Sequence, residues 1–231
     1  MFQHLLLFFQ TADLGTEEVT QESESLFSII ASSGTMGIII VAILLFLAVI
    51  ATVIFFERYA TIKQAGRIDE NFINNIRANV SSGNIAGAKA LCQSTDSPVA
   101  RMVEKGLQRI GKPLRDIDAA IENVGNLEIF RLEKNLSTLA SIAGAAPMIG
   151  FFGTVTGMIA AFQKMATEKN VAPDQLAEGI YQALITTAGG LFIGIIAFVG
   201  YNVLVSSVEK VVYKMERTTV DFMDLLQEPT V

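Results

Sequence analysis

Three long stretches of this 231-residue chain carry no charged side chain. They cover residues 36–56, 135–163 and 179–208, and apolar residues dominate each of them. An α-helix needs about 20 residues to cross the hydrocarbon core of a bilayer, so each stretch is long enough to span a membrane. We therefore predict an all-α integral membrane protein with transmembrane helices at 35–56, 135–163 and 179–208.

Apolar residues at helical spacing extend the second and third predicted spans well beyond the bilayer. From Ile117 onward they recur with a period of 3.6 residues, and no strong breaker separates them from the second span. We expect one unbroken helix over residues 114–163. The third span is expected to form a second long helix over residues 174–225. Both helices should extend far into the cytoplasm.

Residues 57–134, between the first two spans, alternate short amphipathic stretches with turns. The breaks fall at 81–84 and 94–98, where Ser, Thr, Gly, Asn, Asp and Pro gather. The segment has few alternating β-branched residues, which a sheet would need. It is therefore predicted to fold as a small helical bundle.

Lysine and arginine fall mostly on one side of the predicted spans. Within about 20 residues of the spans, eight basic residues flank the side of 57–134 and the C-terminal tail, and two flank the other side. Basic residues near a span stay in the cytoplasm, so the N-terminus is predicted to be periplasmic and the C-terminus cytoplasmic. The remaining segments are assigned as a periplasmic segment 1–34 that begins with an interfacial helix, a cytoplasmic helical domain 57–134, a periplasmic loop 164–178 and a cytoplasmic tail 209–231.

The composition argues against several classes of function. A net charge of −6 offers no basic surface for nucleic acid. One cysteine (Cys92) and one histidine (His4) cannot build a disulfide framework or a metal cluster. No nucleophile–base pair and no phosphate-binding glycine loop appears. We expect no enzymatic activity, no cofactor and no metal, and we interpret Cys92 as a small buried apolar residue.

Small residues line one face of each of the last two spans. Glycine, alanine and threonine recur three and four residues apart, and each span contains a GxxxG pair. Such faces let helices pack closely, and they can also line a passage for a partner helix or for water. The residues that we assign to helix packing are Pro147, Gly150, Gly153, Gly157, Gly190 and Gly194.

Thr154 and Thr187 lie in the middle of these two faces. A hydroxyl in hydrocarbon needs a partner. In one interpretation each hydroxyl bonds back to a carbonyl one turn earlier and serves packing alone. In the other, the small neighbours leave room for both threonines to line a polar pathway. No span has a titratable side chain in its middle, so a proton crossing here would need an acid from another chain.

Several sequence strings resemble the signature of the ExbB/TolQ/MotA proton-channel subunits. The most specific is GFFGTVTGM at 150–158, which follows ASIAGAAP at 140–147. GIYQALITTAGGLFIG at 179–194 continues the resemblance. Three spans with an outside N-terminus resemble ExbB and TolQ more than MotA, which has a fourth span, and within the family the chain resembles ExbB most. Further family-like pieces are Glu57–Arg58, residues 97–101 and Tyr201–Asn202.

The resemblance implies a homopentamer in the bacterial inner (cytoplasmic) membrane around two copies of an ExbD/TolR-like single-span protein. That partner's span carries an aspartate, and a TonB-like protein is a further implied partner. The complex would use the proton motive force to energise TonB-dependent transport. Thr154 and Thr187 would line the pathway. ExbB-type proteins often have a glutamate where this chain has Gln182, and a neutral amide cannot titrate. Further candidates near the pathway or its ends are Glu178, Asn202, Glu57 and Arg58.

Other functions fit the sequence as well. Within the family, the alternatives are a TolQ-like role in envelope maintenance and a motor for gliding or secretion. An alternative of another class is a membrane scaffold that conducts nothing. The identity of the partner, and whether its span contains an acid, separates these alternatives.

Overall fold

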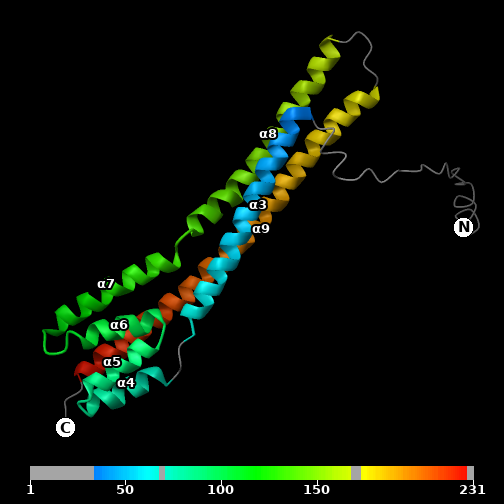
Figure 1. Ribbon diagram of the computed structural model, residues 1–231. Helices are drawn as coiled ribbons and strands as arrows, with labels where there is room; N and C mark the ends of the chain where they lie inside the picture. Colours follow the sequence, from blue (N-terminus) through cyan, green and yellow to red (C-terminus); the bar gives the residue numbers. More distant parts are fainter. Residues whose placement is uncertain (1–33, 68–70, 168–172, 228–231) are drawn as a thin grey trace, which may run out of the picture.

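The computed structural model describes residues 34–67, 71–167 and 173–227 (Figure 1). Every element in these residues is an α-helix and none is a strand, which confirms the predicted all-α class. The predicted interfacial helix at the start of the chain lies outside the described residues. The helices, labelled as in Figure 1, are α3 (Gly34–Ala65), α4 (Phe72–Ser81), α5 (Ile85–Ser94), α6 (Pro98–Leu107), α7 (Leu114–Leu132), α8 (Leu136–Thr167) and α9 (Pro173–Gln227).

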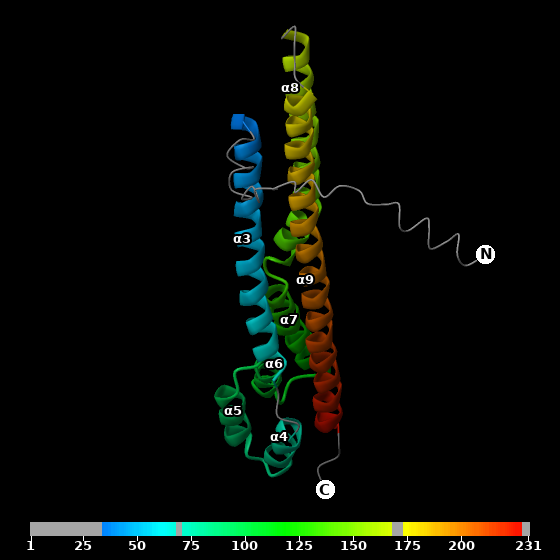
Figure 2. The same cartoon turned by 90° about the vertical axis from the view of Figure 1, so that its right-hand side faces the viewer.

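Three helices are long and apolar enough to cross a membrane, as the sequence predicted. They are α3, α8 and α9. Helices α8 and α9 pack against each other and run antiparallel (Figure 1), and α3 packs along the pair (Figure 2). Both α8 and α9 extend past the N-terminal end of α3 (Figure 2).

The prediction of one helix over 114–163 is wrong, because the chain turns between α7 and α8. Asn135 has φ 64°, in the left-handed region, and interrupts the helix. Asparagine adopts this conformation more easily than most residues, since its short side chain can bond locally. Leu132 and Leu136 are both buried on either side of the turn. Their four-residue spacing matches a continuous helix, so the apolar pattern conceals the break.

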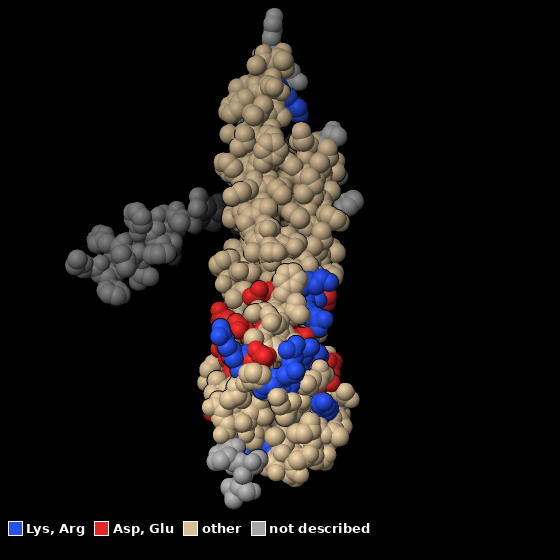
Figure 3. Space-filling model, turned by 90° about the vertical axis from the view of Figure 1, so that its left-hand side faces the viewer, with Lys and Arg blue, Asp and Glu red and all other residues tan. Residues whose placement is uncertain are grey.

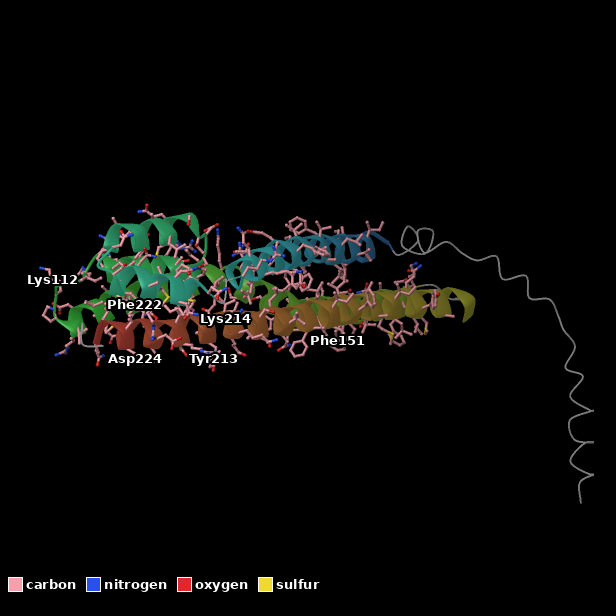
Figure 4. The ribbon with its side chains drawn as sticks, turned by 90° about the horizontal axis from the view of Figure 1, so that it is seen from below. Lys112, Phe151, Tyr213, Lys214, Phe222 and Asp224 are labelled. Atoms are coloured by element: carbon pink, nitrogen blue, oxygen red, sulfur yellow. The ribbon has the colours of Figure 1, made fainter. Side chains whose placement is uncertain are left out.

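Helix α9 is continuous over 55 residues and matches the predicted 174–225 helix. Its far half reaches the short helices α4 and α6 (Figure 1). Phe222 lies there, fully buried (Figure 4). It belongs to the same hydrophobic core as Ile76, Val99 and Leu107. The C-terminal part of α9 therefore completes the core of the small helices.

Side-chain caps begin two of the short helices. The Asn84 side chain accepts a hydrogen bond from the Gly87 N–H at 2.9 Å, at the start of α5. The Ser97 hydroxyl accepts one from the Ala100 N–H at 3.1 Å, and Pro98 occupies the first turn of α6. Such caps satisfy backbone donors that the helix leaves unpaired. They explain why the turn residues predicted at 81–84 and 94–98 separate helices.

Charged side chains are concentrated outside the apolar stretches of the three long helices. On the face shown in Figure 3 they gather in a band below the middle of the molecule, and the surface above this band is almost free of charge until the tip. One lysine of this region ties two helices together. The Lys214 ammonium (Figure 4) donates to the Gly66 carbonyl just after α3, at 2.9 Å.

Candidate functional site at the α8–α9 contact

The backbones of α8 and α9 touch where glycines face each other. A Cβ on Gly150 would lie 2.7 Å from the Thr186 carbonyl oxygen and 3.0 Å from the Gly190 Cα. A Cβ on Gly190 would lie 2.6 Å from the Ala146 carbonyl oxygen. Real side chains do not approach backbone atoms this closely, so only glycine permits this crossing.

The other residues assigned to packing lie along the same contact. A Cβ on Gly194 would meet the Pro147 ring at 2.5 Å, and one on Gly157 would meet the Ala183 Cβ at 2.9 Å. A Cβ on Gly153 would overlap the Thr186 hydroxyl. The structure thus places all six residues where α8 and α9 meet.

Replacing Gly150 by alanine should destabilise this contact. The methyl group would meet backbone atoms of α9, which cannot move aside, and overpacking of this kind costs about 1–3 kcal/mol. Thermal unfolding of the purified protein in detergent measures the effect. Gly144→Ala is the matched control. Gly144 also lies on α8, but a methyl group added there would have no atom of a neighbouring helix within 4 Å. Equal unfolding temperatures for the two variants would contradict the close crossing.

The hydroxyls of Thr154 and Thr187 meet across this contact. Their Oγ1 atoms are 2.8 Å apart. Thr154 also donates to the Phe151 carbonyl in its own helix at 2.7 Å. Thr187 donates across the contact to the Gly150 carbonyl at 3.0 Å. The interpretation in which each hydroxyl bonds only to a carbonyl one turn earlier therefore fits one hydrogen bond of Thr154. It does not fit Thr187, whose hydroxyl bonds to the other helix.

The two hydroxyls make more contacts than they have protons. Each carries one proton, and the pair makes three oxygen–oxygen contacts of hydrogen-bonding length. At any moment one contact lacks a proton. The proton positions can therefore rearrange without movement of the heavy atoms. Both side chains are half-buried, so a further donor or acceptor can reach them.

The remaining predicted pathway residues lie apart from this pair or are not fully described. Gln182 is half-buried on α9, five residues before Thr187. Asn202 lies 15 residues after Thr187, about 22 Å along the helix, where its amide donates to the Phe198 carbonyl at 2.8 Å. Glu178 belongs to α9, but its side chain lies outside the described residues.

Arg58 ties α3 to the end of α7. Its side chain is buried and donates to the Arg131 carbonyl at 3.2 Å. It also pairs with the neighbouring carboxylate of Glu57. A cation at the C-terminus of a helix interacts favourably with the unpaired carbonyls there. Arg58, paired with Glu57, thus joins α3 to α7, and neither residue takes part in the threonine contact.

Two buried polar residues escaped the sequence analysis. Thr186 is only 5% exposed, and its hydroxyl donates to the Ala183 carbonyl at 2.7 Å. Glu128 is 4% exposed and accepts hydrogen bonds from Arg101 and Arg131, each at 2.7 Å. Burial of Glu128 could have been inferred, because it lies seven residues after Ile121 on the apolar face of α7. Burial of Thr186 could have been inferred as well, because it follows Ala183 by three residues and precedes Gly190 by four, on the same small-residue face.

The fold defines a three-span helical membrane protein with a pair of hydroxyls between two of its spans. Residues 94–217 match the model of the MotA/TolQ/ExbB proton channel family, which is more than half of the chain. The chain therefore belongs to this family, as the sequence strings predicted.

Curated relatives carry both ExbB and TolQ names. The chain is 32% identical to a biopolymer transport protein ExbB homolog of Methanothermobacter thermautotrophicus over 120 residues, 52% of this chain and 42% of that protein. It is 26% identical to the Tol-Pal system protein TolQ of Pseudomonas aeruginosa over 189 residues, 77% of this chain and 82% of that protein. It is 30% identical to the biopolymer transport protein ExbB of Xanthomonas campestris over 108 residues, 47% of this chain and 43% of that protein. The matches to both ExbB-named proteins cover less than half of their length.

Proposed function

We propose that this chain is a proton-channel (stator) subunit of a motor in the bacterial inner membrane, which couples the proton motive force to work at the outer membrane. The observation that carries the proposal is the Thr154–Thr187 hydroxyl pair at 2.8 Å, inside a helix contact otherwise built from small residues. The pair can donate to an ionised carboxylate and accept from a protonated one. Both protonation states of an acid beside it are thereby stabilised.

The acid in this mechanism comes from another chain. Residues 36–56, 135–163 and 179–208 contain no Asp, Glu, Lys, Arg or His. A charge in hydrocarbon costs several kcal/mol, so a proton pathway needs a titratable group. An ExbD/TolR-like single-span protein with an aspartate in its span supplies it. A homopentamer of this chain encloses the partner, with α8 and α9 facing inward and the apolar helix α3 facing lipid.

Within the family the proposed role is ExbB-like and energises TonB-dependent transport. Affinity purification in mild detergent, followed by native mass spectrometry, tests the assembly and the role together. We expect a ring of identical subunits with a single-span partner that has an acid in its span, and with a TonB-like protein. A Tol-type partner would assign the TolQ-like role instead. A monomer, or a partner without an acid in its span, would favour the non-conducting scaffold.

The proposed topology places the N-terminus in the periplasm and the C-terminus in the cytoplasm. Cysteines introduced at Thr16 and Asn170 should react with a membrane-impermeant thiol reagent in spheroplasts. A cysteine at the exposed position Ser94 should react only after the membrane is permeabilised. Labelling of Ser94→Cys before permeabilisation would overturn the topology.

The native cysteine should not interfere with this experiment. Cys92 is buried, and burial raises the pKa of its thiol to about 12, with a smaller contribution from the charge of Glu104. The thiolate is the reactive form, and at pH 8 roughly one molecule in ten thousand would carry it. The unmodified protein should therefore stay unlabelled while folded and become labelled in denaturant.

A further inference from the structure

Thr186 lies directly beside the Thr154–Thr187 pair. Its hydroxyl donates to the Ala183 carbonyl at 2.7 Å. The same oxygen is 3.4 Å from the Gly150 carbonyl, the acceptor that Thr187 uses at 3.0 Å. Two adjacent hydroxyls of α9 thus lie within hydrogen-bonding range of one carbonyl of α8.

This arrangement matters when Thr187 turns its proton toward an acid. The Gly150 carbonyl then keeps the backbone N–H of Thr154, four residues later in α8, but its second lone pair loses its donor in a buried contact, which costs free energy. Thr186 can replace the donor by rotation of its O–H bond alone, because its oxygen is already in place. The Ala183 carbonyl that it leaves keeps the backbone N–H four residues later in α9.

We propose that Thr186 is a positioning residue for proton transfer, which acts as the reserve donor to the Gly150 carbonyl. It frees the proton of Thr187 to bond the acid on the partner helix. This inference rests on the proposed function, because it requires that the Thr154–Thr187 pair serves such an acid.

The surroundings of Thr186 hold its hydroxyl at this position. The side chain is 5% exposed and fills the space where a Cβ of Gly153 would be. That same space is bordered by Ile40 of α3, at 3.4 Å from the hypothetical Cβ. Three helices therefore enclose Thr186, and water has little access to replace it as a donor to the Gly150 carbonyl.

Proton flux through the chain and its co-purified partner, reconstituted in liposomes with a pH-sensitive dye, tests the inference. Thr186→Val keeps the shape and removes the hydroxyl, and it should lower the flux about fivefold to tenfold, the effect of one buried acceptor short of a donor. Thr186→Ala should lower it similarly. Thr186→Ser keeps the hydroxyl and should stay within about twofold of the unmodified complex.

A purely structural role of Thr186 predicts the opposite order. Packing by the methyl group would leave Thr186→Val normal and would make serine as harmful as alanine, and this result would overturn the inference. Normal flux in Thr186→Val, together with loss of flux in Thr187→Val, would overturn this inference and leave the proposed function standing. Normal flux in Thr187→Val would instead contradict the proposed function, and the inference with it.

Discussion

Replacing Thr154 or Thr187 by valine should lower proton flux by one to two orders of magnitude and leave the assembly intact. Valine keeps the shape of threonine, but it cannot donate to an ionised carboxylate or accept from a protonated one. Each hydrogen bond to a charged group is worth about 1.5–3 kcal/mol, so the loss of one should slow transfer roughly tenfold to a hundredfold. Dye-monitored flux in liposomes measures the loss, and native mass spectrometry checks the assembly.

Thr156, which lies on α8 two residues after Thr154, provides the matched control for this experiment. The Thr156 hydroxyl donates within its own helix, to the Phe152 carbonyl at 3.0 Å and the Gly153 carbonyl at 3.1 Å. Thr156→Val should therefore conduct normally. Serine at position 154 or 187 retains the hydroxyl and should restore much of the flux. If both valine variants conduct like the unmodified complex, the hydroxyl pair serves packing alone.

Replacing Glu128 by alanine should destabilise the contact between α6 and α7. Its buried carboxylate binds Arg101 of α6 and Arg131 of α7, and its hydrogen bond raises the pKa of Arg101. Removing one member of a buried ionic cluster costs about 3–5 kcal/mol. The arginine side chains are 38% and 68% exposed, so water partly replaces the lost partner. We expect a loss of about 3 kcal/mol.

Chemical unfolding of the purified chain in detergent measures this change in free energy. Glu122→Ala is the matched control, because Glu122 is an exposed acid on the same helix. It should change the unfolding free energy by less than about 0.5 kcal/mol. Equal effects of the two substitutions would show that the ionic cluster adds no stability.

The long helices could be predicted from the sequence because their signals are local. Uncharged runs of 20 residues or more locate the spans, and helical spacing of apolar residues extends α9 to Gln227. Glycine spacing located the face on which α8 and α9 meet. These signals depend on neighbours within one or two helical turns, and a single sequence displays them directly.

Features that depend on contacts between distant residues could not be predicted in this way. Arg58 donates to Arg131, 73 residues farther along the chain, and no periodicity reveals that pairing. The turn at Asn135 depends on one backbone dihedral angle that the apolar pattern does not record. The role of Thr186 depends on the opposing Gly150 carbonyl, 36 residues earlier in the chain, which no pattern within α9 reveals.

The continuity of α9 makes it a lever arm. Thr187 lies between the spans and Phe222 lies in the far core, 35 residues away, or about 50 Å at 1.5 Å per residue. A tilt of about 5° at Thr187 would carry Phe222 roughly 4–5 Å if the helix stays straight. Such a displacement approaches one helical turn, and it would move the small helices together with Phe222. A slight movement among the spans would therefore be largest where α9 meets α6.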